Sequence, residues 1–505
     1  MQLNNIRWRL SEAVRRTLFH TDDKHPLRHL YRVVRAVPGV RLLWRTIDAR
    51  NPTDAAFERH VSAGGIFGPS EPHDPETLPP VVAFDDPDFF RNLIARIKTC
   101  EPRLRTGSDT IVLINNGLSA GGAERQIINT MLGLKARDVP AVFIGEYLKA
   151  APGQDFHLDT LVRAGGDARE LERLTQPGNS VFEQISRPVA EQLFRIESSM
   201  LLEILDMVRM LRNLNPRAVH LWQDQTAVKH ALSALIAGVP RIVLSGRNLN
   251  PTHFAYHQDC MRPAYLALLT QRHVVLSNNS HAGARSYADW LGIEPARIQV
   301  VHNGFDFNNW PAVTPTRREE IRASFGIPDD GVLVAGVFRL SPEKRPLLWI
   351  ETAAEALKLD PRLHFIVAGE GDLRREIEGR ISDRGLGQRL TLAGRMENVH
   401  SLFKACDVFL LTSEQEGIPN VLLEAQWYGR PVLATRAGGA EEALQDRVTG
   451  RISDESDPGV LARQLVDLIN DQALRARANA SGRGFIARSF SIDRMIDETL
   501  ELYGG

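Results

Sequence analysis

Two carboxylates flank a tight turn in the stretch SEQEGIPNVLLEAQWYGRPVLATRAGG, which covers residues 413–439. Glu416 comes before the turn, and Glu424 follows with seven residues between the two acids. Pro419 and Asn420 predict the start of a helix, because proline suits a first helical turn. Glu424 then lies one turn into that helix and can face the same side as Glu416. Since a carboxylate accepts hydrogen bonds from vicinal hydroxyl groups, the pair could hold two hydroxyl-bearing parts of one ligand.

The backbone of the same turn predicts an anion site. The free N–H groups at a helix amino terminus carry partial positive charge and bind phosphate groups. We expect a diphosphate to lie against this turn, which consists of Gly417, Ile418, Pro419, Asn420 and Val421. The alternative is structural: Glu424 would be an early helical acid favoured by the helix dipole, and Glu416 an ordinary surface charge.

Cations follow other apolar runs. The stretch GVFRLSPEKRP places Arg339 and Lys344 directly after one run, and Arg395 follows the run LTLAG. A planar guanidinium and a compact ammonium together suit a diphosphate, so we predict that Arg339 and Lys344 clamp one. Arg395 stands at a strand end that can hold a nucleotide base. The alternative for Arg339 and Lys344 is solvated surface charge, the usual state of Arg and Lys.

A loop of small residues comes earlier in the chain. The stretch NNGLSAGGAERQ places Gly121 and Gly122 just before a predicted helix. Glycine allows the backbone to approach a ligand closely, and the helix start favours anions. The loop matches neither the dinucleotide pattern Gly-x-Gly-x-x-Gly nor the Gly-Lys phosphate loop, which disfavours NAD and ATP. A plain strand-to-helix turn is the alternative.

These residues follow short apolar runs that occur in two series. Each run is nearly continuously apolar and bounded by Gly, Asn or Pro, which is typical of a parallel strand buried on both faces. The first series covers residues 110–118, 141–147, 217–224, 241–247, 273–279 and 298–304, and the second covers 331–340, 363–371, 390–396, 407–413 and 431–435. We therefore predict an α/β protein with two tandem Rossmann-like doubly wound domains that face each other across a cleft.

The length of 505 residues also requires more than one core. We place a mainly helical N-terminal extension at residues 1–107, a first domain at 108–310 and a second at 311–485. No apolar run approaches the length of a membrane span, and the first residues lack the apolar core of a secretory signal. The three cysteines are far apart, which excludes a disulfide framework and a zinc cluster and favours the cytoplasm.

The start of the chain is strongly basic. Residues 1–50 hold ten Arg and one Lys against four acidic residues, a net charge of +7. Apolar residues recur at helical spacing beside these arginines, which predicts an interfacial helix docked on the anionic inner face of the plasma membrane. The alternative is an amphipathic helix packed on the first domain. We expect no nucleic-acid partner.

At this point the residues resemble a known family, the retaining glycosyltransferases of family 4, which have the GT-B fold. The stretch EGIPNVLLEA is similar to the paired-Glu motif of that family. GGAER (121–125), HNGFD (302–306) and FRLSPEKRP support the resemblance in the expected order, and it covers about residues 108–500. It implies that the first domain serves the acceptor and the second the nucleotide-sugar donor, and that a C-terminal helix at 486–505 returns to the first domain.

The resemblance also implies roles for single residues. Glu424 corresponds to the acid that binds the ribose, and Glu416 to the acid near the donor sugar. Arg339 and Lys344 correspond to the diphosphate clamp, and Gly121 and Gly122 to the first-domain loop that touches donor phosphate or acceptor. No metal or other cofactor is expected.

One departure concerns a strand end. Many members of the family carry a histidine where this chain has Gly246 and Arg247. We expect Arg247 to take over contact with the donor sugar or phosphate. His220 and His253, which are near in sequence, are expected to be structural.

The expected function is transfer of a hexose or N-acetylhexosamine, with retention, from a nucleotide-sugar such as a UDP-sugar. The acceptor would be a glycan or a lipid-linked sugar in the synthesis of a cell-surface polysaccharide or glycolipid. Two alternatives stay open: a catalytically inactive GT-B scaffold, and a sugar-nucleotide epimerase.

Overall fold

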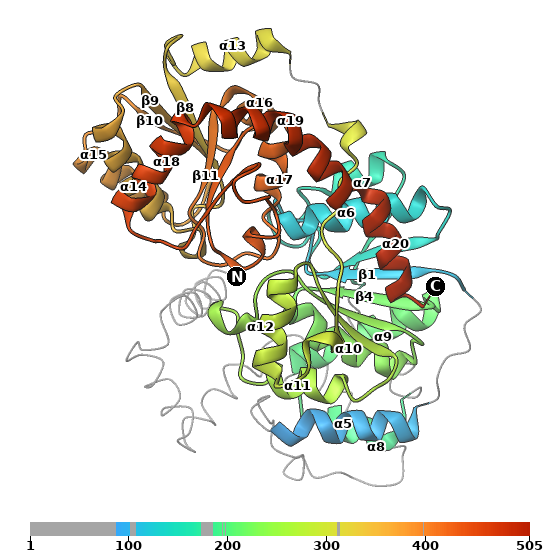
Figure 1. Cartoon of the computed structure of the whole chain (residues 1–505). Coiled ribbons are helices and arrows are strands. Elements are labelled where there is room, and N and C mark those ends of the chain that lie inside the picture. Colours follow the sequence, from blue (N-terminus) through green and yellow to red (C-terminus); the bar gives the residue numbers. More distant parts are fainter. Residues whose placement is uncertain are drawn as a thin grey trace, which may run out of the picture.

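The computed structural model describes residues 87–101, 108–172, 185–193, 195–196, 198–310, 314–396 and 398–504. It contains two parallel sheets, a seven-stranded one in what we call the first lobe and a six-stranded one in the second lobe (Figure 1). This arrangement confirms the predicted α/β fold with two Rossmann-like units, the GT-B architecture. The exact residues at which one domain gives way to the next stay predictions.

The first sheet is built around its first strand. In sheet order, the strands are β3 (Asp167–Glu170), β2 (Ala141–Gly145), β1 (Ile111–Asn115), β4 (Ala218–Trp222), β5 (Ile242–Gly246), β6 (Val274–Asn278) and β7 (Ile298–Val300). All five residues of β1 are buried. Val112 and Ile114 belong to one hydrophobic core and Ile111 and Leu113 to another, because successive side chains point to opposite faces. Helices therefore cover both faces, as the unbroken apolar run predicted.

The second sheet has a similar plan. In sheet order, its strands are β10 (Leu390–Gly394), β9 (Leu363–Ala368), β8 (Val332–Val337), β11 (Val408–Leu411), β12 (Val432–Thr435) and β13 (Gly450–Ser453). In both sheets the strand order reverses beside the first strand, between β1 and β4 and between β8 and β11. Such a reversal leaves a crevice at the carboxyl ends of the strands, which is where open α/β sheets bind ligands.

The helices of the first lobe pack on both faces of its sheet. They are α5 (Pro87–Cys100), α6 (Gly122–Lys135), α7 (Leu158–Arg163), α8 (Arg187–Leu193), α9 (Ser198–Leu214), α10 (Asp224–Ala237), α11 (Met261–Leu268) and α12 (His281–Leu291). Phe89 and Phe90 of α5 are buried in the same core as α9 and α10. Thus α5, which lies in the segment predicted as an extension, completes the first lobe. Residues 1–86 and 102–107 of that segment lie outside the described residues.

The helices of the second lobe are α13 (Pro315–Ser324), α14 (Pro346–Leu359), α15 (Arg374–Asp383), α16 (Val399–Ala405), α17 (Asn420–Trp427), α18 (Pro458–Asn470) and α19 (Gln472–Ser489). After α19 the chain returns to the first lobe as α20 (Ile492–Leu502), which lies along α6 (Figure 1). Phe305, on the outward crossing, donates its N–H to the Phe490 carbonyl at 2.9 Å, and its carbonyl accepts from Ile492 N–H at 3.0 Å. The two crossing segments are therefore hydrogen-bonded to each other.

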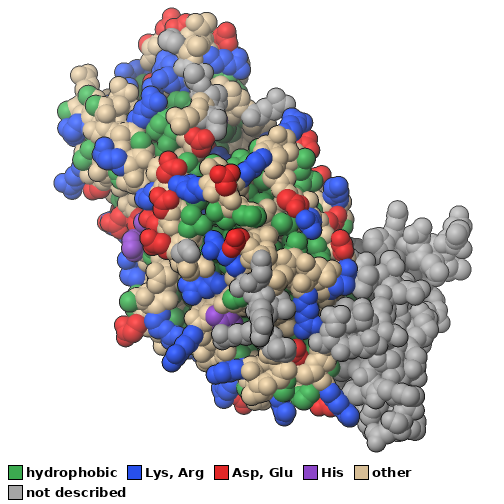
Figure 2. Space-filling view, turned by 90° about the vertical axis from the view of Figure 1, so that its right-hand side faces the viewer, with side chains coloured by type: hydrophobic (Ala, Val, Ile, Leu, Met, Phe, Trp, Pro, Cys, Tyr) green, Lys and Arg blue, Asp and Glu red, His purple; other side chains and the backbone are tan. Residues whose placement is uncertain are grey.

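Charges of both signs are mixed on the surface. On the face seen in Figure 2, Lys and Arg side chains alternate with Asp and Glu, and hydrophobic side chains are exposed in small groups. Among the described residues, no helix is both long enough and apolar enough to cross a membrane. The predicted membrane contact involves residues 1–50, which lie outside the described residues.

Candidate active site

The predicted site residues follow the strands at which each sheet reverses its order. The loops after β1 and β4 carry Gly121 and Gly122 and the start of α10, and the loops after β8 and β11 carry Arg339 and Glu416. These four loops come from the carboxyl ends of parallel strands in both lobes. Direct contacts between the lobes, described below, bring them together.

Glu416 is held beside the predicted clamp. Lys344 Nζ lies 2.6 Å from Glu416 Oε1, and both side chains are mostly buried. Arg345 follows Lys344 and donates to the carbonyls of Thr412 and Ser413 at 2.7 and 2.9 Å, so this loop is tied to the end of β11. The pair therefore has a fixed place, because the two loops that carry it are joined by the Arg345 side chain and by a backbone hydrogen bond from Glu414 N–H to the Glu343 carbonyl at 2.8 Å.

The Gly-Gly pair at the end of the opening stretch packs on the same loop. Gly439 N–H donates to the Glu416 carbonyl at 3.2 Å. A side chain at Gly438 would collide with that carbonyl, and one at Gly439 would collide with the carbonyl of Gly417. Gly438 also has a positive φ of 51°, a conformation that favours glycine. The two glycines thus allow the strand β12 to support the turn that carries Glu416.

The helix predicted after the turn is α17. Pro419 is its N-cap residue, and Asn420 is its first helical residue. The amino terminus of α17 faces that of α6 in the first lobe, where Asn420 Nδ2 donates to the Gly122 carbonyl at 3.3 Å. A side chain at Gly122 would press on Asn420, so glycine permits this approach. Two helix amino termini next to each other make the junction suitable for an anion.

Glu424 lies on α17 and pairs with the first lobe. Arg125 Nη1 is 2.7 Å from Glu424 Oε1, and the Glu424 side chain is only 1% exposed. Arg125 belongs to the first turns of α6 and its guanidinium lies over the Phe305 ring, 5.3 Å from the centroid. The acid predicted to bind ribose is thus joined directly to the loop predicted to touch the donor.

Glu124, the residue before Arg125, is a buried acid of the first lobe. It accepts a hydrogen bond from Gln223 Nε2 at 3.3 Å, and its carboxylate folds over Gly121, where only a glycine leaves room. Burial raises the pKa of Glu124, although Ser119, Arg339 and Gln223 act in the opposite direction. Arg339 is therefore near enough to interact across the cleft, although its own side chain is exposed.

Arg247 follows β5, at the strand end where many members of the resembled family carry a histidine. Its guanidinium lies 4.4 Å from the centre of the Trp222 ring and donates to Asn303 Oδ1 at 2.6 Å. Asn303 in turn donates to the Ile418 carbonyl at 3.2 Å and to Asn420 Oδ1 at 2.6 Å. Burial lowers the pKa of Arg247 to about 9. Arg247 thus supports the turn before α17 through Asn303.

Arg395 lies at the opposite end of the site. It follows β10 and its guanidinium lies over the exposed ring of Phe156 in the first lobe, 5.2 Å from the centroid. The loop after β9 packs against the Arg339 loop, where Leu340 N–H donates to the Glu370 carbonyl at 3.0 Å. Gly369 and Gly371 allow this contact, because a side chain at either would meet the backbone of the Arg339 loop.

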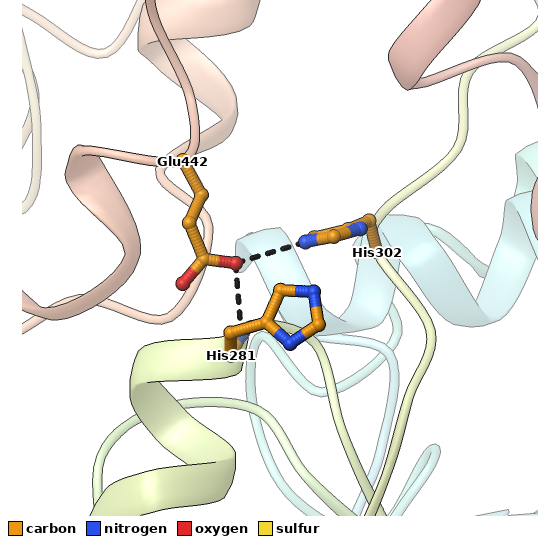
Figure 3. A group of neighbouring side chains, drawn as sticks. All are labelled: His281, His302 and Glu442. Atoms are coloured by element: carbon orange, nitrogen blue, oxygen red, sulfur yellow. Dashed lines mark hydrogen bonds and ion pairs between the residues drawn. The ribbon is translucent and has the colours of Figure 1, made fainter.

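A second carboxylate crosses between the lobes at the start of α12. Glu442 accepts the N–H groups of His281 and Ala282, both at 2.8 Å, and its Oε2 is 2.9 Å from His302 Nε2 (Figure 3). The possible metal-binding atoms of His281, His302 and Glu442 lie within 4.8 Å of one another. Since three N–H donors already engage Glu442, we assign this cluster to fastening the lobes.

The first lobe also contains a cavity of about 210 Å³ beyond the ends of β1 and β2. Its lining combines amide and methionine side chains with an ionic network, in which Lys229 pairs with Glu146 and, at 2.8 Å, with Glu203. Burial alone would raise the pKa of Glu146, but His230 and Lys229 lower it to about 2.

Sequence reasoning missed several residues of this site. Arg125 and Asn303 lie within the quoted stretches GGAER and HNGFD, but they received no role. Gln223, directly after β4, has a positive φ of 65°, an unusual backbone conformation that the sequence does not reveal. Of the two histidines expected to be structural, His220 is buried with its ring 2.8 Å from the Tyr503 hydroxyl, and burial lowers its pKa to about 3. His253 is exposed, so its structural role stays a prediction.

Comparison with known proteins gives one family and several relatives. The sequence pattern of the family described as glycosyl transferases group 1 matches residues 317–485. The Vi polysaccharide biosynthesis protein VipC/TviE of Salmonella typhi is 31% identical over 433 residues, which are 81% of this chain and 73% of that protein. The UDP-Gal:alpha-D-GlcNAc-diphosphoundecaprenol alpha-1,3-galactosyltransferase of Escherichia coli is 26% identical over 59% of this chain and 78% of its own length.

Solved structures share the fold. The crystal structure of Anabaena Alr3699/HepE in complex with UDP and glucose matches 78% of this chain and 99% of its own, with a TM-score of 0.65 and 21% identity. A sucrose-phosphate synthase of Thermosynechococcus elongatus matches 78% of this chain and 98% of its own, with a TM-score of 0.59 and 17% identity. At these identities the likeness establishes the two-lobed fold.

Proposed function

This chain belongs to the glycosyl transferases group 1 family, and we propose that it transfers a sugar from a UDP-sugar to a glycan or lipid-linked acceptor with retention of configuration, as a member of retaining family 4. The single observation that carries the proposal is the junction of α6 and α17. It combines two helix amino termini with the Lys344–Glu416 pair, 2.6 Å apart, and the Arg125–Glu424 pair, 2.7 Å apart. Such a junction offers separate partners for a diphosphate, a sugar and a ribose.

The chemistry follows from where charge develops. When the bond between the sugar and the diphosphate breaks, negative charge grows on the departing diphosphate. Lys344, which Glu416 holds in place, the exposed Arg339 and the amides at the start of α17 are the cations and dipoles that stabilise this charge, with no metal or other cofactor required. Glu416 accepts a hydrogen bond from a hydroxyl group of the donor sugar and keeps Lys344 in place. Glu424 accepts hydrogen bonds from the ribose hydroxyl groups.

The acceptor approaches from the first lobe. The cavity beyond β1 and β2 joins amide side chains of Asn116, Gln225 and Gln258 with the apolar Met200 and Met261. Amides bind hydroxyl groups, and apolar surface suits the carbon face of a sugar ring. A hexose or N-acetylhexosamine is the transferred group, and a glycan or glycolipid of the cell surface is the product. Two of the relatives above support a glycan or glycolipid product, because one is named for polysaccharide biosynthesis and the other for a diphosphoundecaprenol acceptor.

The location follows from the acceptor. A cytoplasmic enzyme that works on lipid-linked sugars benefits from docking on the inner face of the membrane, and residues 1–50 carry the net charge of +7 that such docking needs. Sedimentation with anionic vesicles should decrease on deletion of residues 1–50 and at high salt. Unaltered sedimentation after deletion would leave these residues a packing role only.

The central experiment is a transfer assay. Purified protein is incubated with UDP-glucose, UDP-galactose and UDP-N-acetylglucosamine and with lipid-linked acceptors, and products are identified by mass spectrometry and by the NMR coupling of the new anomeric proton. A product with the anomeric configuration of the donor supports the proposal, and inversion contradicts it. UDP-sugar binding without any product would favour the inactive scaffold, and interconversion of two free UDP-sugars would favour the epimerase. Glu416→Gln is the matched control and should lose transfer.

A further inference from the structure

We propose that Arg125 of the first lobe is a positioning residue for the donor, because it holds the Glu424 carboxylate in the orientation that accepts the ribose hydroxyls. The inference rests on the proposed function, in which Glu424 binds ribose. It adds a residue from the opposite lobe to a binding site that otherwise belongs to the second lobe.

The contact itself is short and specific. Arg125 Nη1 donates to Glu424 Oε1 at 2.7 Å, across 299 residues of sequence. In the part of the chain that the structure describes, this is the hydrogen bond that the Glu424 carboxylate accepts, and it uses only one of the two oxygens. Oε2 therefore keeps its capacity to accept ligand hydroxyls, while Oε1 fixes the plane of the carboxylate.

Burial makes the pair important. The Glu424 side chain is 1% exposed, whereas the Arg125 side chain is 30% exposed at the junction of the lobes. A buried carboxylate that loses the one cationic partner found for it among the described residues is left with an uncompensated charge, which changes its position or its protonation. The ribose site thus depends on a guanidinium that the second lobe does not supply.

Arg125 is itself held by its place in α6 and by its contact with Phe305. It follows the glycine pair at the start of α6, and its guanidinium lies over the Phe305 ring. The Phe305 backbone is in turn hydrogen-bonded to Phe490 and Ile492. His157 is close enough that Arg125 contributes, after burial, to lowering the pKa of that imidazole to about 4. A side chain so placed can orient its partner, because it has little freedom of its own.

The test measures whether Arg125 acts on ribose recognition. Isothermal titration calorimetry compares UDP, 2′-deoxy-UDP and inorganic diphosphate for the full-length protein and for Arg125→Ala, Arg125→Lys, Glu424→Gln and the double variant Arg125→Ala/Glu424→Gln. We expect Arg125→Ala to raise the Kd for UDP about 10-fold or more, in line with loss of a buried ionic partner. The preference for UDP over the deoxy analogue should disappear, while the Kd for inorganic diphosphate stays unchanged. Arg125→Lys should recover part of the affinity, because the contact uses a single nitrogen.

The double variant separates positioning from mere support of the fold. If Arg125 acts through Glu424, then Arg125→Ala should change the UDP affinity by less than about 2-fold in the Glu424→Gln background. In the transfer assay the single change should raise the KM for the donor more than it lowers kcat. Arg137→Ala is the matched control, since Arg137 lies just beyond the other end of α6 and pairs with Asp493 and Asp497 on α20. It should bind UDP as the unaltered protein does.

Each outcome decides a different question. Additive losses in the double variant, or unchanged ribose preference in Arg125→Ala, would overturn the inference and leave the proposed function intact. Failure of the unaltered protein to bind UDP while it binds another nucleoside diphosphate would move the same test to that nucleotide. Failure to bind any nucleoside diphosphate would overturn the proposed function and the inference with it.

Discussion

Two glutamates of the second lobe reach across to the first, and their surroundings differ in one respect. Both oxygens of Glu442 are engaged, because His281 N–H and the His302 ring bond to Oε2 and Ala282 N–H bonds to Oε1. Glu424 receives one bond, from Arg125, on one oxygen. A carboxylate with both oxygens engaged by the other lobe is suited to joining the lobes, whereas one with an oxygen that accepts no hydrogen bond from the described residues can also bind a ligand. The predictions below test this difference between a fastener and a binding group.

The largest effect is expected at Glu416, the second acid with a single charged partner. Glu416→Ala removes the carboxylate that accepts a donor hydroxyl and leaves Lys344 unpaired. We expect kcat for transfer to fall about 100-fold or more, the size typical of losing one group that stabilises the transition state. Glu442→Ala, measured in the same assay, should keep kcat within about 3-fold. An equal loss of kcat in the two variants would remove the distinction between binding and fastening acids.

The cations of the clamp should have the next largest effect. Arg339→Ala and Lys344→Ala should each lower kcat/KM about 10- to 100-fold, because each removes one charge beside the departing diphosphate. Arg339→Lys should recover only part of the loss, since lysine lacks the planar fork. Arg374→Ala is the control, because Arg374 is a nearby arginine that pairs with Glu370 in the loop before α15 and with Glu378 on α15 itself. Full activity in Arg339→Ala would show that Arg339 is not the cation that acts with Lys344 on the diphosphate.

Replacing Glu442 should affect the stability of the fold rather than the transfer activity. Glu442→Ala leaves two amides at the start of α12 and the His302 ring without their partner, so we expect the free energy of unfolding to decrease by about 1–3 kcal/mol. Chemical denaturation followed by circular dichroism measures this change. The Kd for UDP should be unaltered, in contrast to Glu424→Gln. If Glu442→Ala had normal stability but weakened UDP binding, Glu442 would be a ligand-binding residue and not one that joins the lobes.

A smaller effect should depend on pH. Burial alone would raise the pKa of Glu442, but His302 and the amides of Ala282 and His281 lower it below its ordinary value of 4.5. The contribution of Glu442 to stability is therefore full above pH 4.5 and is lost as the pH falls through the lower, folded-state pKa. The stability difference between the unaltered protein and Glu442→Gln should shrink in that window. A difference that is constant or grows on acidification would contradict the assignment.

The fold was largely predictable because its central strands are buried on both faces. Such strands read as short apolar runs, and eleven of the thirteen strands lie within the predicted runs. The two missed strands, β3 and β13, lie at the edges of the sheets and have partly exposed sequences, DARE and GRIS. The other two edge strands, β7 and β10, were predicted because their sequences, IQV and LTLAG, belong to apolar runs, whereas DARE and GRIS each contain a single apolar side chain.

The site was predictable only where its residues follow strands. Glu416, Arg339 and Lys344 are found at strand ends, so the sequence order locates them. Arg125 could not be assigned, because its role depends on contact with a residue 299 positions away. Asn303 lies on the segment between the lobes, where no periodic pattern marks a binding surface. The predicted roles of Glu416, Glu424 and Arg247 toward the donor stay predictions until the experiments above are done.

The return of α20 to the first lobe has a consequence for how the protein is made. Met495, Ile496 and Tyr503 belong to the same hydrophobic core as β1 and α6. A ribosome that has just released β7 has therefore supplied a first lobe with an unfilled face. That face stays open during synthesis of the whole second lobe, and chaperones that bind nascent chains would find their target there. Supplying residues 486–505 as a separate peptide should rescue solubility of a fragment that ends near residue 310.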